Sequence, residues 1–233
     1  MNTLRTDIED AYSRRDRSKG DRYGWWQPDV INQHFIRDMA VRRFLHDAFG
    51  GDLSKIDVLD AGCGHGGLLR SLIECGVDPA RMIGVDMLDS RIEEARRRSP
   101  SDLRFEIGDA TKVDAGQSFD LVTAFTVLSS IHPDPRRAEV LRALQDRVRP
   151  GGWLLLFDFR FNNPRNPDVS GVKPRWITDA ARSGETHLRT MFTPPPIARR
   201  LAPVSPMLDR CFGQIVFPLR SHYLLGLKQA ARV

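Results

Sequence analysis

Cysteine and long apolar runs are scarce in this 233-residue chain, and each scarcity excludes a class of protein. Cys63, Cys75 and Cys211 are odd in number and lack metal-type spacing, which argues against a disulfide framework or a zinc site. We therefore expect free thiols in a reducing compartment, the cytosol. No apolar run approaches the roughly 20 residues that span a bilayer, so we expect no membrane partner.

Lysine is also scarce, because the 35 basic residues include only 5 lysines. The formal charge of +5 could attract nucleic acid, but the arginines are scattered along the chain and form no evident patch. We therefore expect no nucleic-acid partner. A nucleic-acid-binding module remains an alternative, and its affinity would fall steeply with salt.

The apolar pattern predicts one α/β domain with an N-terminal extension. Apolar residues recur at helical spacing from Asp29 to Phe49, and a regular alternation of strand and helix patterns follows. The predicted strands in this part are 56–61, 81–86, 103–107, 119–125 and 153–158, and the predicted helices are 66–75, 89–98 and 134–148. Towards the carboxyl end, two further strands are predicted at 185–193 and 215–228. Between them lies a predicted helix that begins at Pro194-Pro195-Pro196. Residues 162–174 are predicted to form a long loop. This alternation favours a mostly parallel sheet covered by helices on both faces.

The segment from Val58 to Gly67 is the most informative part of the chain. An apolar strand ends near Asp60 and turns through alternating glycines into a helix. Glycines permit positive φ and leave backbone N–H groups and a helix N-terminus facing a ligand. Two ligands fit the spacing: Gly62-x-Gly64-x-x-Gly67 satisfies the dinucleotide fingerprint, and Gly62-x-Gly64-x-Gly66 satisfies that of S-adenosylmethionine enzymes.

Later motifs distinguish a dinucleotide from S-adenosylmethionine as the ligand. Asp86 ends the second strand about 20 residues after the loop, where a carboxylate can accept hydrogen bonds from both ribose hydroxyls. The remaining motifs are Gly108-Asp109-Ala110, Phe119-Asp120-Leu121-Val122 and Arg149-Pro150-Gly151-Gly152. In this order, residues 55–160 resemble the class I S-adenosylmethionine-dependent methyltransferases. The resemblance implies a Rossmann-like class I methyltransferase fold, with a mostly parallel seven-stranded sheet and helices on both faces, and S-adenosyl-L-methionine as the cofactor.

The resemblance also implies which residues bind that cofactor. They are Asp60, Gly62, Cys63, Gly64 and Gly66 around the methionine portion, Asp86 at the ribose, Met87, Asp109 and Ala110 around the adenine, and Phe125 and Thr126 beside the sulfonium. Plain core packing is the alternative for Met87 and Phe125. Residues 1–50 would form an N-terminal helical extension or lid, and residues 51–233 the methyltransferase catalytic domain.

Candidate acceptor-side residues follow the fourth and fifth strands. His132 is the candidate general base, although it is shifted along from the position where many relatives carry a histidine, and it could instead be an exposed loop residue. Arg160, Asn162, Asn163 and Arg165 are candidate substrate-binding residues, since arginine binds carboxylate or phosphate oxygens in pairs; a turn built from asparagine and proline is the alternative.

Aromatic residues of the N-terminal segment are the other candidates for substrate binding. Tyr12, Tyr23, Trp25 and Trp26 could close over the site and exclude water, or they could anchor an extra helix to the core. The run from Asp158 to Pro167, together with residues 11–16 and 221–225, is similar to a bacterial subgroup of small methyltransferases of natural-product and surface-glycan pathways. That similarity implies a biosynthetic O-methyltransferase that acts on a hydroxyl, carboxylate or phosphonate of a small polar or anionic metabolite.

The end of the fourth strand narrows the chemistry. It reads Ala124-Phe125-Thr126, and not the Asn-Pro-Pro-aromatic sequence of enzymes that methylate base or glutamine amino groups. It also lacks an acid that could join Asp158 around a divalent ion, so we predict no metal. A small-molecule N-methyltransferase and a nicotinamide-dependent oxidoreductase remain alternatives, and a homodimer is left open.

Overall fold

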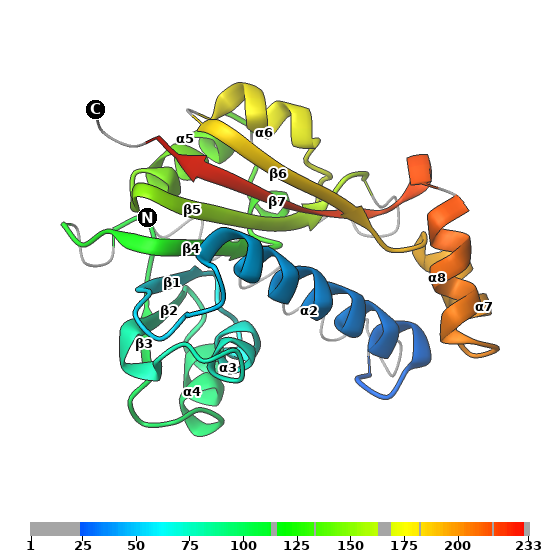
Figure 1. The fold of residues 1–233 in the computed structure, drawn as a ribbon, viewed down its shortest axis with the longest axis horizontal. Coiled ribbons are helices and arrows are strands. Elements are labelled where there is room, and N and C mark those ends of the chain that lie inside the picture. The colour runs from blue at the N-terminus through cyan, green and yellow to red at the C-terminus, as the bar shows by residue number, and fades with distance from the viewer. Residues whose placement is uncertain are drawn as a thin grey trace.

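The chain folds around one seven-stranded sheet in a computed structural model that describes residues 24–112, 116–132, 134–162, 169–181, 183–215 and 217–230 (Figure 1). The strands are β1 (Val58–Ala61), β2 (Met82–Asp86), β3 (Arg104–Ile107), β4 (Phe119–Phe125), β5 (Val148–Phe159), β6 (Ser183–Met191) and β7 (His222–Gln229). Their order is β3-β2-β1-β4-β5-β7-β6; β7 runs antiparallel to both of its neighbours, β5 and β6, and the other pairings are parallel. The predicted mostly parallel α/β fold is confirmed.

The order of the strands reverses direction at the centre of the sheet. The chain begins with β1, adds β2 and β3 on one side, and then returns to add β4 on the other side of β1. In open α/β sheets, ligands bind beyond the carboxyl ends of the strands at this reversal point. The loops after β1 and β4 are therefore where a ligand is expected.

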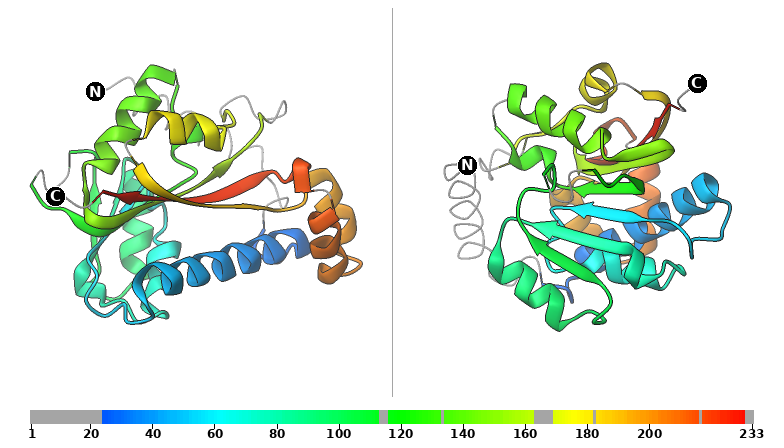
Figure 2. Two further views of the ribbon diagram at one scale, coloured as in Figure 1. Left: turned by 45° about the horizontal axis from the view of Figure 1, so that its top comes forward. Right: turned by 90° about the vertical axis from the view of Figure 1, so that its left-hand side faces the viewer.

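Helices cover both faces of the sheet (Figure 2). The helices α2 (Pro28–Phe49), α3 (Gly67–Ile73) and α4 (Asp89–Arg97) pack on one face, and α5 (Asp134–Gln145) and α6 (Pro174–Ala180) pack on the other. Because successive strand residues point to opposite faces, Leu155 and Phe157 join the first core cluster while Leu154 and Leu156 join the second. Apolar side chains are buried on both faces, as the near-continuous apolar strands predict.

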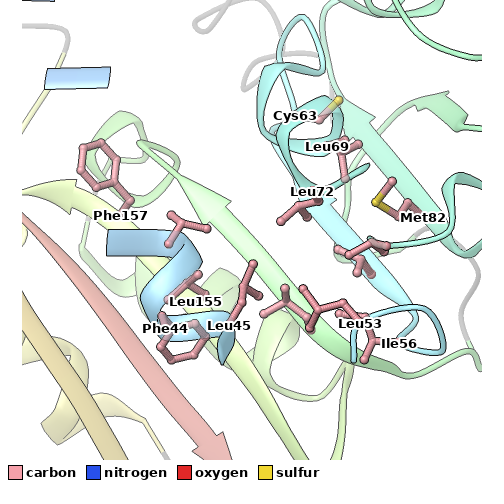
Figure 3. Close-up of a cluster of buried hydrophobic side chains, with 14 of the residues drawn as sticks. Phe44, Leu45, Leu53, Ile56, Cys63, Leu69, Leu72, Met82, Leu155 and Phe157 are labelled. Atoms are coloured by element: carbon pink, nitrogen blue, oxygen red, sulfur yellow. The ribbon is translucent and has the colours of Figure 1, made fainter. Parts of the chain in front are cut away.

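Helix α2 is fixed to the sheet by aromatic packing. The Phe44 ring lies edge-on to the Trp153 ring at 5.2 Å, and Phe44 and Leu45 lie near Leu155 in the buried cluster (Figure 3). A Cβ atom at Gly226 would lie 2.5 Å from the Phe44 ring, so the glycine makes room for it. The amino end of α2 lies beside α7 (Pro195–Leu201) and α8 (Pro206–Ile215), on the side of the carboxyl ends of the parallel strands (Figure 1).

Several boundaries differ from the sequence prediction. Strand β5 begins at Val148, so the predicted Pro150-Gly151-Gly152 turn lies inside the strand as an irregularity in its pairing with β4, with Gly151 at φ +83°. The predicted strand 215–228 begins only at His222. Helices α6 and α8 and the short 3-10 helices η2 (Pro79–Arg81), η3 (Leu128–Ser130) and η4 (Phe217–Leu219) were not predicted. The unpredicted elements are at most 10 residues long, and apolar periodicity is weakest over such lengths.

Within the described part of the chain, no helix is both long enough and apolar enough to cross a membrane.

Tyr223 in β7 provides a test of the packing. It is fully buried, and its hydroxyl has no hydrogen-bond partner among the described residues. Removing an unsatisfied hydroxyl while keeping the ring relieves a desolvation penalty, so we expect Tyr223→Phe to raise the free energy of unfolding by about 1 kcal/mol. Urea denaturation measures this change. A loss of stability of similar size would contradict the expectation and would mean that the hydroxyl is bonded.

Candidate functional site

The loop between β1 and α3 has the backbone conformation that its glycines were predicted to provide. Gly62, Gly64 and Gly66 have φ of +69°, +54° and +71°, while Gly67 is already the first residue of α3. A Cβ atom at Gly62 would lie 2.6 Å from Cγ2 of Val127, beyond the end of β4. The alternating spacing 62-64-66 is thus the one that the backbone requires.

The end of β2 holds this loop in place. The carbonyl oxygen of Val85 accepts hydrogen bonds from the backbone N–H groups of Gly62 and Cys63 at 2.8 and 3.0 Å. The Asp86 carboxylate accepts one from the N–H of Gly64 at 2.9 Å and another from Leu88 at 3.0 Å. Asp86, the predicted ribose carboxylate, is therefore hydrogen-bonded to Gly64 in the loop that is predicted to bind the methionine portion.

Asp60 is a buried carboxylate beneath the loop. It accepts a hydrogen bond from the Thr123 hydroxyl at 2.6 Å, and burial raises its pKa to about 7, with the negative charge of Asp86 adding to the rise. The positive charge of Arg37 on α2 opposes that rise. A buried carboxylate with a raised pKa gains free energy when a cationic group binds beside it. Burial also raises the pKa of the neighbouring Cys63 thiol, which argues against a thiolate nucleophile there.

The predicted adenine-side residues follow β2 and β3. Met87 is half-buried next to Asp86, and the Gly108 N–H donates to the Asp86 carbonyl oxygen at 2.9 Å, which joins the two strand ends. The Asp109 carboxylate accepts hydrogen bonds from the backbone N–H and hydroxyl of Thr111 at 3.0 and 2.7 Å. Ala110 is half-buried against the second core cluster. Asp109 thus has a structural role in holding Thr111, in addition to its predicted role at the adenine.

Phe125 and Thr126 end β4 beside the glycine loop. Thr126 has φ of +57°, a conformation that is uncommon for a residue with a Cβ atom, and its N–H donates to the Phe157 carbonyl oxygen at 2.7 Å. The Phe125 ring lies 5.4 Å from the Phe157 ring. Backbone strain of this kind persists only where surrounding contacts hold it, and it is concentrated at ligand sites.

The segment after β4 carries His132, which is exposed, with Nδ1 3.4 Å from the Ser170 hydroxyl. Buried Arg137, which the sequence did not single out, holds this segment by donating to the carbonyl oxygens of Leu128 and Ile131 at 2.8 and 3.0 Å. Asp158 at the end of β5 accepts the Ser129 N–H at 3.0 Å, and burial raises its pKa to about 6. No sequence motif marks Arg137, because its partners include backbone carbonyl groups and the distant Ser170 hydroxyl.

The predicted substrate-binding residues that the structure describes make local contacts. Arg160 donates to the Arg220 carbonyl oxygen at 2.9 Å, and the Asn162 side-chain oxygen accepts the Gly171 N–H at 2.8 Å, so both take part in local structure. Trp25 and Trp26 precede α2 and are exposed, with their rings edge-to-face at 5.9 Å. Tyr12, Tyr23, Asn163 and Arg165 lie outside the described residues.

A cavity of about 210 Å³ was not predicted from the sequence. It is lined by residues of α2, the end of β6, α8 and Arg220. Separately, the described ranges contain no group of three His, Cys, Asp or Glu side chains arranged to hold a metal ion.

The family follows from the site together with a match to known proteins. Residues 58–152, from the glycine loop to the start of β5, match a family described as methyltransferase domain. This segment of the chain is a methyltransferase domain, and its fold is that of S-adenosylmethionine-dependent methyltransferases. This result decides between the two ligands that the glycine spacing left open, and S-adenosylmethionine is the cofactor.

Relatives of this methyltransferase share most of its length. The ubiquinone biosynthesis O-methyltransferase of Acinetobacter baylyi is 26% identical over 209 residues, which are 87% of this chain and 84% of that protein. The protein of the same name from Azorhizobium caulinodans is 31% identical over 150 residues, 57% of this chain and 56% of that protein. Both are similar to this methyltransferase at low identity.

Solved structures share its fold. Magnesium protoporphyrin IX methyltransferase from Synechocystis PCC 6803, with bound S-adenosylmethionine, has a TM-score of 0.66 at 20% identity and covers 97% of each chain. The N-methyltransferase NodS from Bradyrhizobium japonicum, in complex with S-adenosylhomocysteine, has a TM-score of 0.64 at 16% identity, covering 94% of this chain and 98% of that one.

Proposed function

We propose that this methyltransferase transfers the methyl group to an oxygen atom of a small polar or anionic metabolite: a hydroxyl, a carboxylate or a phosphonate. The observation that carries the methyl-donor part of the proposal is the glycine loop, with three left-handed glycines between buried Asp60 and Asp86. The names of the curated relatives support oxygen as the methylated atom.

The residues present fit the cofactor. Gly62 and Gly64 offer a backbone surface without Cβ atoms, and Asp60 offers a buried carboxylate suited to the ammonium group of the methionine portion. Asp86 accepts one backbone N–H on each oxygen and keeps lone pairs for ribose hydroxyls. We propose the same set as predicted above for the cofactor, with Met87, Asp109 and Ala110 at the adenine and Phe125 and Thr126 beside the sulfonium.

The chain itself would contribute alignment and the exclusion of water. When bound, the cofactor supplies an electrophilic methyl group on a positively charged sulfur. Displacement requires the attacking oxygen to lie in line with the bond that breaks, and holding it there accounts for much of the rate. Phe125 and Phe157 give an apolar wall at the end of β4 and β5 that would keep water away.

The need for a general base depends on the acceptor. A hydroxyl acceptor needs a proton acceptor, and we keep His132 as the proposed base because it follows β4 and its side chain is exposed. A carboxylate or phosphonate is already ionised and needs none. Trp25, Trp26, Arg160 and Asn162 stay proposed substrate contacts, together with Tyr12, Tyr23, Asn163 and Arg165.

Titration calorimetry tests the cofactor part of the proposal. We expect S-adenosylhomocysteine to bind with a stoichiometry of one per chain, and NAD to release no binding heat at the same concentration, because the backbone requires the 62-64-66 spacing. The opposite pattern would contradict the proposal. Methyl transfer from labelled S-adenosylmethionine to panels of hydroxyl, carboxylate and amine compounds then tests the acceptor atom, and transfer to amines alone would overturn the oxygen assignment.

A further inference from the structure

The cavity beside α2 has a cationic wall. Its lining includes Arg189 from β6, Arg210 from α8 and Arg220 from the segment before β7. The one carboxylate in the wall, Asp209, is buried, and one of its oxygens accepts a hydrogen bond from the Asn32 side chain at 2.5 Å. Three guanidinium groups against one carboxylate leave the wall positively charged.

Two of the three arginines are held in place by the fold. Arg220 donates to the carbonyl oxygens of Gly213 and Thr190 at 2.8 and 2.9 Å, and to the Gln214 side-chain oxygen at 2.6 Å. Burial lowers its pKa, and the positive charges of Arg189 and Arg160 add to that effect. Arg210 donates to the Asn32 side-chain oxygen at 2.9 Å, and its guanidinium lies 4.3 Å from the centre of the Phe35 ring. These contacts fix the positions of two positive charges at the cavity.

Arg189 is held less firmly. Strand alternation puts His187, Arg189 and Met191 on the face of β6 that meets α2, where His187 contacts Phe44 and the other two line the cavity. Among the described residues, the Arg189 guanidinium forms no hydrogen bond or ion pair. Arg189 and Arg210 are exposed, so solvent screens their repulsion, and an anion that contacts all three guanidinium groups would gain charge-assisted hydrogen bonds from each.

The rest of the wall is apolar. Phe35, Ile36 and Met39 come from α2, and Met191 and Phe192 come from the end of β6. A cavity of about 150 Å³ accommodates benzene, so about 210 Å³ accommodates one ring and a small substituent. Phe192 has φ of +70°, so the wall holds a strained residue, as ligand sites often do.

The cavity adjoins the end of β4 through one layer of aromatic rings. The Phe192 ring lies 5.8 Å from Phe157, which in turn lies 5.4 Å from Phe125. His222 packs against the rings of Phe157 and Phe192, and burial lowers its pKa to about 3. It is therefore uncharged at neutral pH and offers an anion no further positive charge. Phe192 is therefore both a wall of the cavity and the first ring of the layer that leads to the end of β4, where the methyl group is proposed to lie.

We propose that this cavity is the recognition site for the acceptor, and that it binds a compact, apolar, singly ringed molecule through a carboxylate or phosphate group held by Arg189, Arg210 and Arg220. The inference rests on the proposed function, and it names the substrate class. It moves the main anion contact from the loop after Asp158 to the joint between β6 and α8.

Ligand-observed NMR and calorimetry on the full chain test the proposal with benzoate, phenyl phosphate and neutral benzamide as probes, with and without saturating S-adenosylhomocysteine. We expect benzoate and phenyl phosphate to bind and benzamide not to bind. We expect Arg189→Ala to weaken benzoate binding about tenfold, the loss of one charge-assisted hydrogen bond, and to leave the affinity for S-adenosylhomocysteine unchanged. The matched control is Arg175→Ala on α6, because the Arg175 side chain is 92% exposed. This variant should leave both the benzoate affinity and the S-adenosylhomocysteine affinity unchanged.

The outcomes separate this inference from the proposed function. Equal binding of benzamide and benzoate, or full affinity of the Arg189→Ala variant, would overturn the acceptor site even if S-adenosylhomocysteine binds. Competition between benzoate and S-adenosylhomocysteine would overturn it as well, because the probe would then occupy the cofactor site. Failure of S-adenosylhomocysteine to bind would instead count against the proposed function, while the benzoate titration without cofactor would still test the cavity.

Discussion

Gly62→Ala should lower the affinity for S-adenosylhomocysteine by about 100-fold or more, which makes it the most damaging single-methyl change in the loop. A left-handed conformation costs a residue with a Cβ atom about 1–2 kcal/mol. The new methyl group would also lie 2.6 Å from Cγ2 of Val127, a distance that real Cβ contacts do not show. Either the loop or the segment after β4 must move. Calorimetry measures the loss of affinity.

Gly76→Ala is the matched control for this variant. Gly76 follows α3 with φ of +98°, and a Cβ atom there would meet nothing within 4 Å. We expect it to lose about 1 kcal/mol of stability from backbone strain and to bind S-adenosylhomocysteine as the unaltered chain does. Equal affinity losses in the two variants would mean that strain acts through global stability, and the loop would then not be specific for the ligand.

The sequence predicted the centre of the sheet better than its far edge. The apolar runs of β1, β2 and β4 stop at Asp60, Asp86 and Phe125. After β1, glycines with positive φ mark the turn into the next helix. These signals are local and therefore readable from neighbouring residues. At the other edge, α8 is short and amphipathic, and Met207 and Leu208 are exposed, so its apolar residues did not indicate a buried face.

The acceptor side was harder to predict for a different reason. Arg189, Arg210 and Arg220 belong to three different segments and meet only because β6 ends beside α8. Arg160 lay in a run with a second arginine and three asparagines, whose guanidinium and amide groups suggested substrate binding, but its guanidinium donates to the Arg220 carbonyl oxygen. Sequence composition shows where arginines are frequent, and tertiary structure decides which of them face a cavity. The predicted role of Arg160 in binding substrate stays a prediction.

The affinity for S-adenosylhomocysteine should also rise with pH between about pH 6 and about pH 7.5. Asp60 has a pKa of about 7, and only its ionised form pairs with an ammonium group. The ionised fraction grows from about one tenth to about three quarters over this interval, so the affinity should rise about eightfold. Asp60→Asn should bind weakly and without this pH dependence. The same eightfold rise in the variant would exclude Asp60 as the group responsible.

The contribution of Asp60 to the free energy of unfolding should fall as the pH rises, whereas the affinity for S-adenosylhomocysteine should rise. This difference separates an electrostatic effect on binding from a general effect of pH on the protein. The pKa of Asp60 in the folded chain lies above its value of 3.8 in the unfolded chain, so its stabilising contribution is complete below about pH 3.8 and is lost as the pH rises through about 7. Without ligand, the difference in unfolding free energy between Asp60→Asn and the unaltered chain should therefore grow in favour of the variant from about pH 5 to about pH 8. Asp158 and His222 titrate in both proteins and cancel in this difference. A constant difference across that range would show that Asp60 is ionised throughout, and its carboxylate would then not be the pH-dependent partner of the ammonium group.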